Sequence, residues 1–199
     1  MALRWFKDSV CGQEKDGDYF DVLNNAAKDV PAGSDGVLFL PYLTGGTNDV
    51  KEATGCFLNM TLDTDQATLW HAVLEAIGYD YMEITDLYRG AGVDMSRITI
   101  TEGGSRSEIW NQMKSDMLGS EVITLKNAGG AVVTDCIVGA YALGHITDMK
   151  EALTESLEIK KLYYTNAENH DFYAKQYALQ KKLVKQDMKE AFHTLKALH

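Results

Sequence analysis

The sequence predicts an α/β fold: a single domain in which helices cover a mixed sheet. Short apolar runs bounded by glycine, proline or polar residues are typical of buried strands, and several such runs occur in the chain. Longer segments carry apolar residues at helical spacing. In the second half the two kinds of segment alternate, which is the pattern of an α/β protein. The 199 residues suffice for one large domain or two small ones, with a substantial core.

The first half of the chain begins with helices and then changes to strands. Its expected elements, in order, are two helical pieces within residues 1–30, a turn at 31–36, strands at 37–40 and 55–60, and a long helix from Thr64-Asp65 to Arg89-Gly90. The second half alternates. Its expected elements are a strand at 97–101, a glycine turn with a helix ending at Leu118-Gly119, a strand at 121–124, a helix from about Ala131 to Leu143 that Gly144 stops, and a helix from about Glu168 to Leu198.

The turn at Gly103-Gly104 is the most informative local feature. It follows an alternating strand and opens an amphipathic helix, and Ser105 and Glu108 have the spacing of a capping box. The sequence therefore predicts that the helix begins directly after the glycines. Free N–H groups and the positive end of a helix dipole would then suit a phosphate. The alternative is a purely structural turn. It is not a Walker loop, because no Gly-Lys-Ser/Thr follows.

Composition excludes several classes of function. A net charge of -10 argues against nucleic-acid binding, which requires clustered basic residues. No apolar run approaches the roughly 18 residues of a membrane span, and the first residues lack the apolar core of a signal peptide. The 3 cysteines are odd in number and widely spaced, which indicates reduced thiols and a cytoplasmic protein. The 5 histidines are scattered and predict no metal site.

Taken in order, several blocks of the sequence resemble the C-terminal half of the FGGY carbohydrate kinases, most closely the xylulokinase-like branch. The blocks are Ala2-Leu3-Arg4-Trp5-Phe6-Lys7-Asp8, Gly36-Val37-Leu38-Phe39-Leu40-Pro41-Tyr42-Leu43-Thr44-Gly45, Gly55 to Glu75, and Glu102-Gly103-Gly104-Ser105-Arg106-Ser107-Glu108-Ile109-Trp110. The resemblance implies an actin-like, ribonuclease H-like ATPase domain over residues 1–199. It also implies that the N-terminal FGGY domain is absent from this chain.

The resemblance further implies ATP and Mg²⁺ as cofactors and a set of nucleotide-binding residues. These candidates are Gly103, Gly104, Ser105, Glu108 and Arg4. No catalytic residue is expected in the chain, because the general base of the family lies in the N-terminal domain. Asp116, Asp135 and Glu75 are accordingly expected to be structural or surface groups, and Trp110 to be core. Glu102, beside the expected phosphate site, is a candidate for the shell of a metal.

The chain departs from the family pattern at three of these positions. Asn59 replaces a glycine, Thr68 replaces a histidine-like or amide residue, and Glu108 stands where glycerol kinases place an asparagine that contacts adenine. The identity of the sugar therefore stays open. It also stays open whether Glu108 contacts adenine or only caps the helix.

The activity implied for the full-length enzyme is transfer of the γ-phosphoryl group of ATP to a hydroxyl of a ketose such as xylulose. The expected partners are the N-terminal domain and the sugar, with a homodimer as a further option. The chain alone is expected to be inactive, because one domain cannot close around the substrate. It is also expected to expose an apolar face near residues 40–43. The alternatives are a non-catalytic nucleotide-binding module and another actin-like ATPase domain.

Overall fold

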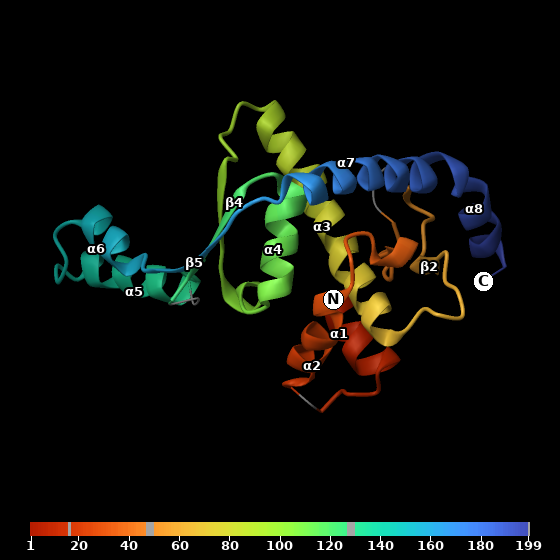
Figure 1. Ribbon diagram of the computed structural model, residues 1–199. Helices are drawn as coiled ribbons and strands as arrows, with labels where there is room; N and C mark the ends of the chain where they lie inside the picture. Colours follow the sequence, from red (N-terminus) through yellow and green to blue (C-terminus); the bar gives the residue numbers. More distant parts are fainter. Residues whose placement is uncertain (16, 47–49, 127–129, 199) are drawn as a thin grey trace.

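One long helix, α3 (Gln66–Gly90), runs through the centre of the molecule (Figure 1). The computed structural model describes residues 1–15, 17–46, 50–126 and 130–198. The helix begins where the sequence predicts, because the Asp65 side chain accepts a hydrogen bond from the Thr68 N–H at 2.8 Å. From Thr68 to Tyr79 nearly all of its side chains are buried. An all-round buried helix of this kind serves as the core on which other elements pack.

The elements around α3 follow the chain order. They are α1 (Ala2–Trp5), a π-helical turn (Phe6–Val10), α2 (Tyr19–Ala26), 3-10 turns (Ala27–Asp29 and Ser34–Gly36), β1 (Leu38–Leu40), β2 (Cys56–Leu58), β3 (Arg97–Ile100), a 3-10 turn (Glu102–Ser105), α4 (Glu108–Leu118), β4 (Glu121–Leu125), α5 (Gly130–Ala142), α6 (Met149–Ser156), β5 (Ile159–Tyr163), α7 (Ala167–Lys182), a second π-helical turn (Leu183–Asp187) and α8 (Lys189–Ala197).

The strands form two separate sheets, and not the single sheet that the sequence predicts. Strands β1 and β2 pair antiparallel, with Phe39 opposite Phe57. Strand β4 lies between β3, to which it is parallel, and β5, to which it is antiparallel, so the larger sheet is mixed as predicted. The sheets stay apart because α3 packs against β1 on one side and against α4 on the other.

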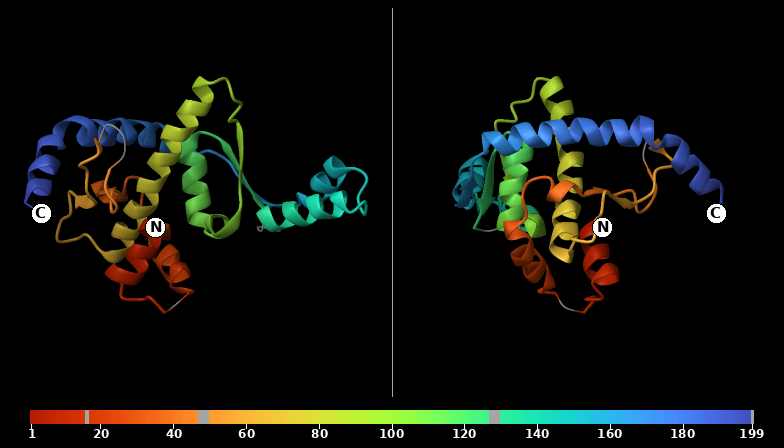
Figure 2. Two further views of the ribbon diagram at one scale, coloured as in Figure 1. Left: turned by 180° about the vertical axis from the view of Figure 1, so that it is seen from behind. Right: turned by 45° about the vertical axis from the view of Figure 1, so that its right-hand side comes forward.

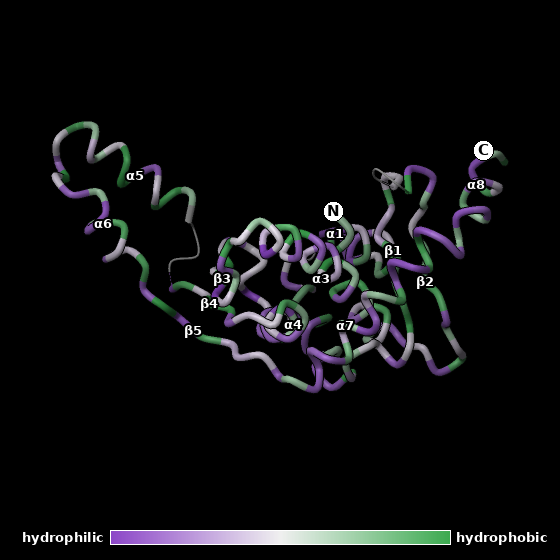
Figure 3. The backbone as a smooth tube through the Cα atoms, turned by 90° about the horizontal axis from the view of Figure 1, so that it is seen from above, coloured by the Kyte–Doolittle hydropathy of each residue, from purple (hydrophilic) through white to green (hydrophobic). Residues whose placement is uncertain are grey.

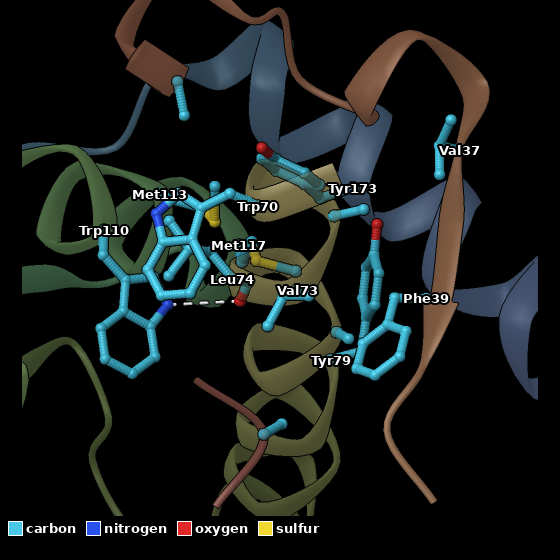
Figure 4. Close-up of a cluster of buried hydrophobic side chains, with 14 of the residues drawn as sticks. Val37, Phe39, Trp70, Val73, Leu74, Tyr79, Trp110, Met113, Met117 and Tyr173 are labelled. Carbon is cyan, nitrogen blue, oxygen red and sulfur yellow. Dashed lines mark hydrogen bonds between the residues drawn. The ribbon is translucent and has the colours of Figure 1, made fainter. Parts of the chain in front are cut away.

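The core joins both sides of α3. Figure 4 shows Trp70, Val73 and Leu74 of α3 with Phe39 of β1 and with Trp110 of α4. Tyr173 and Tyr177 of α7, the helix that crosses the top of the molecule in Figure 1, belong to the same cluster. The Trp110 indole N–H donates to the Leu74 carbonyl at 3.2 Å, so its one polar atom is satisfied. Trp110 is a core residue, as expected.

The predicted C-terminal helix is real but broken. A π-helical turn follows α7, and the Met188 N–H bonds to the Leu183 carbonyl before α8 begins. The extra residue in this turn rotates the apolar stripe, and Val184 and Phe192 pack with Leu40 in a second small core. The structure also contains α6 and β5, which the sequence does not predict.

Helices α5 and α6 pack on each other and extend away from the remainder of the molecule (Figures 1 and 2). The apolar face expected near residues 40–43 is not exposed. Leu40 is fully buried, and Tyr42 and Leu43 are half-buried. Exposed apolar side chains occur at many places along the described residues, and four of them lie on α5 or directly after it: Val132, Val138, Tyr141 and Leu143. Among the described residues, no helix is both long and apolar enough to cross a membrane.

Candidate functional site

The glycine turn between β3 and α4 forms a 3-10 turn at Glu102–Ser105, and α4 begins only at Glu108. The capping-box prediction is therefore wrong. Ser107 is the N-cap and accepts from the Trp110 N–H at 3.3 Å, whereas the Ser105 hydroxyl donates back to the Glu102 carbonyl at 2.7 Å. The Ser105 hydroxyl closes the turn itself, and the N-cap of the helix therefore lies two residues further along the chain, at Ser107.

Neither glycine is required by the local backbone. The residue with positive φ in this turn is Glu102, at +58°. A Cβ added at Gly103 would meet no other heavy atom within 4 Å, and one at Gly104 would meet Lys114 Nζ and Trp110 Cζ3 at an ordinary 3.7 Å. A tight structural turn would exclude a Cβ at these positions. At Gly103 the missing side chain leaves open space above the turn.

That space is a cavity of about 410 Å³ between the turn and the N-terminal helices. This volume lies within the range of small-molecule sites, roughly 300–1,000 Å³. Apolar walls and polar groups both contribute to it. The lining residues are Leu3, Gly17, Asp18, Phe20, Asp21, Asn24, Trp70, Leu74, Gly103, Gly104, Arg106, Ser107 and Trp110. The Asn24 side chain is held in place by the Trp70 indole, which donates to its oxygen at 3.0 Å.

The structure brings only part of the predicted set together. Gly103 and Gly104 line the cavity. Ser105 is buried beneath it. Glu108 is exposed and pairs with Lys161 of β5 at 2.8 Å, which lowers the pKa of the Glu108 carboxyl. Arg4 is exposed and does not line the cavity, although the neighbouring Leu3 does.

Sequence reasoning missed the opposite wall. Asp18 precedes α2 and, in the sequence, belongs only to a break between helical pieces. Phe20 and Asp21 lie in the first turn of α2 and, in the sequence, belong only to the second helical piece. Trp110 has the apolar spacing of a core residue, and the structure gives it both roles because it is 6% exposed and lines the cavity. No spacing signal connects α2 to a turn so far along the chain. Only the packing of both segments on α3 brings them together.

The carboxylates set aside as structural are engaged elsewhere or exposed. Asp116 accepts from the Asn166 N–H and the Asn169 amide at 2.9 and 2.8 Å, which ties α4 to the start of α7. Asp135 is exposed on α5. Within the part of the chain that the structure describes, no group of three or more His, Cys, Asp or Glu side chains could hold a metal ion. The cavity has the size and the mixed polar and apolar lining of a small-molecule site, and the described residues offer no side-chain cluster for a metal ion.

Comparisons with known proteins identify the family and the fold of the chain. The sequence model of the FGGY family of carbohydrate kinases, C-terminal domain, matches residues 2–143. A xylulose kinase of Staphylococcus epidermidis is 28% identical over 187 residues, 93% of this chain and 37% of its own length. A gluconokinase of Bacillus subtilis is 32% identical over 169 residues, 79% of this chain and 32% of its own length. The chain thus spans about a third of the curated relatives that it matches.

The crystal structure of a xylulose kinase from Rhodospirillum rubrum matches with a TM-score of 0.77, over 96% of this chain and 38% of that protein. At 24% identity this likeness shows the fold alone, which is the actin-like ATPase fold of these kinases. A glycerol kinase of Plasmodium falciparum, solved with ADP, has a TM-score of 0.69 at 14% identity and covers 82% of this chain and 33% of that protein. Because the family model matches well over half of its residues, the chain belongs to the FGGY family of carbohydrate kinases, and its matching part is the C-terminal domain.

Proposed function

We propose that this chain is the ATP-binding part of a kinase that transfers the γ-phosphoryl group of ATP to a hydroxyl of a ketose such as xylulose. Family membership supports the kinase class. The observation that carries the nucleotide site is the cavity in which Gly103 and Gly104 face α2. Among the relatives, the xylulose kinases favour a ketose, and the gluconokinase is the competing choice.

In this proposal, different parts of the cavity bind the adenine and the phosphates. Phe20 and Trp110 offer aromatic walls to the adenine, while the backbone at Gly103 and Gly104 and the Arg106 guanidinium offer hydrogen-bond donors to phosphate. Ser105 supports the turn. We assign no ligand contact to Arg4 or Glu108. Mg²⁺ would enter bound to the nucleotide phosphates, and we assign it no protein ligand.

Titration of ATP into the wild-type chain tests the site. One wall of the site belongs to the partner domain, so we expect weak affinity, on the order of millimolar or about 4 kcal/mol. Gly104→Val should abolish binding by placing a branched side chain between the turn and Trp110, which lines the cavity. The variant should still fold, because a Cβ there makes only ordinary contacts. Gly90→Val is the matched control, since a Cβ at Gly90 meets nothing within 4 Å and Gly90 does not line the cavity. Equal affinity of wild type and Gly104→Val in isothermal titration would reduce the turn to a structural element.

A second measurement separates a kinase from a passive nucleotide-binding module. The chain alone should show no turnover of ATP with D-xylulose in a coupled assay, because the proposal places the general base in the N-terminal domain. Supplying that domain, fused or in trans, should restore phosphorylation of a sugar. Turnover by the chain alone would contradict this division of labour. Nucleotide binding without turnover in the restored protein would favour the passive module.

A further inference from the structure

Two buried polar side chains of α4 hold the glycine turn from beneath. The Lys114 ammonium group donates to the Gly104 carbonyl at 2.8 Å, and the Asn111 amide donates to the Ser105 carbonyl at 2.7 Å. Lys114 is only 2% exposed and Asn111 is 0% exposed. Both carbonyls are therefore drawn towards the helix and away from the cavity. In a planar trans peptide the N–H points opposite to the C=O, so the Ser105 N–H points away from the Lys114 anchor, whereas the Arg106 N–H donates to the Gly103 carbonyl at 3.3 Å within the turn.

Lys114 is a buried lysine with no carboxylate partner among the described residues. Its other contacts are the Asn111 side-chain oxygen at 3.4 Å and the Trp110 ring, whose centroid lies 3.7 Å from Nζ. Carbonyl dipoles and an aromatic face stabilise a cation only in part. In the described ranges of the chain, no carboxylate lies within ion-pair distance of this ammonium group. Burial accordingly lowers the pKa of Lys114 to about 7.

The titratable neighbours on the packed elements have other contacts. Tyr163 of β5 contacts the Asn111 amide, and Tyr81 of α3 stacks on Trp110. Further along α4, Asp116 is held by residues at the start of α7, and the His170 ring bonds the Asp116 carbonyl. Asp18 and Asp21 also line the cavity, from the start of α2. An anionic ligand above Gly104 would add a negative charge on the side of the cavity where Lys114 lies.

We propose that Lys114 is a positioning residue for the nucleotide, which fixes the Gly104 carbonyl beneath the turn and supplies a buried positive charge behind the phosphates. This inference rests on the nucleotide site proposed above. An anion in the cavity stabilises the charged form of Lys114, so binding near and above neutral pH is accompanied by uptake of a proton. Affinity should then be highest at and below about pH 7 and fall as the pH rises towards about pH 9, by at most about tenfold per pH unit.

The test is ATP affinity as a function of pH, followed by NMR of the nucleotide protons between about pH 7 and pH 9, where the phosphates are already ionised. Lys114→Met keeps the unbranched side chain and removes the donor and the charge. We expect it to weaken binding at pH 7 by about tenfold and to flatten the pH profile. Lys175→Met removes an exposed lysine of α7 and should behave as wild type.

The possible outcomes are distinguishable. A Lys114→Met variant that folds and keeps the affinity and the pH slope of wild type would overturn this inference alone. A purely structural role would change the unfolding midpoint of Lys114→Met without changing the pH slope of binding, and would likewise overturn it. A wild-type chain that binds no ATP at any pH would overturn the proposed site together with this inference.

Discussion

The Glu75 carboxyl lies at the centre of a buried polar network on α3. It accepts from the Gly33 N–H at 2.7 Å and from the Ser34 hydroxyl at 2.8 Å. His71 Nδ1 lies 2.9 Å from the Ser34 oxygen. Because the Ser34 hydrogen is directed to Glu75, Nδ1 acts as the donor towards Ser34. The network ties the turn before β1 to the central helix, and burial raises the pKa of Glu75 to about 7.

This pKa predicts a pH dependence of stability that Glu75→Gln removes. The folded-state pKa lies above the unfolded value of 4.5, so the contribution of Glu75 is complete below pH 4.5 and is lost as the pH rises through about 7. Relative to wild type, Glu75→Gln should gain on the order of 2–3 kcal/mol of unfolding free energy across that window. Urea unfolding at a series of pH values measures it. Glu190→Gln, at an exposed position of α8, is the matched control, and a constant difference between Glu75→Gln and wild type would refute the assignment.

At the scale of elements, the start of α4 depends on Ser107. The N-cap bond to the Trp110 N–H satisfies a donor that the helix itself leaves unpaired. Ser107→Ala should lower the free energy of unfolding by about 1 kcal/mol, and Ser9→Ala, at an exposed serine, should have no measurable effect. The denaturant midpoints of the two variants, compared with that of wild type, measure these changes in stability. An unchanged midpoint for Ser107→Ala would mean that α4 is fixed by packing alone.

Elements were predictable from sequence where local and tertiary signals coincide. Helix α3 has both a capping aspartate at Asp65 and an apolar face, and it was predicted at both ends. Strand β5 carries Lys160 and Lys161 and is largely exposed, and α6 has no buried residue, so neither has an apolar pattern to detect. The turn was found from Gly103 and Gly104 themselves. The wall that faces it was not, because pairing two distant segments is a property of packing and not of local sequence.

At the scale of the whole molecule, the α5–α6 hairpin leaves apolar surface uncovered. Figure 3 shows the hydrophobic colouring along α5, away from the body of the chain. Val132 is 67% exposed and Leu143 is 75% exposed. Uncovered apolar surface of this kind favours association.

We therefore expect the isolated chain to self-associate at high concentration. The double variant Val132→Glu/Leu143→Lys should shift it towards monomer, since each charge also suits its end of the α5 dipole. Gln186→Glu/Thr194→Lys adds the same charges at exposed polar positions and should leave association unchanged. Light scattering over a concentration series compares the three proteins. A strictly monomeric wild type would rule out the hairpin as a contact surface.

The cavity lies between the N-terminal segment of the chain and the turn in its middle. Leu3 and Phe20 form one side, and Gly103 and Trp110 form the other. A ligand seated there contacts both sides only while α1 and α2 remain docked on α3, so it would oppose their local detachment by mass action. Ligand binding in the cavity and docking of the N-terminal helices are thus linked equilibria, and each favours the other. A molecule bound in the cavity would stabilise the state in which α1 and α2 are docked on the rest of the fold.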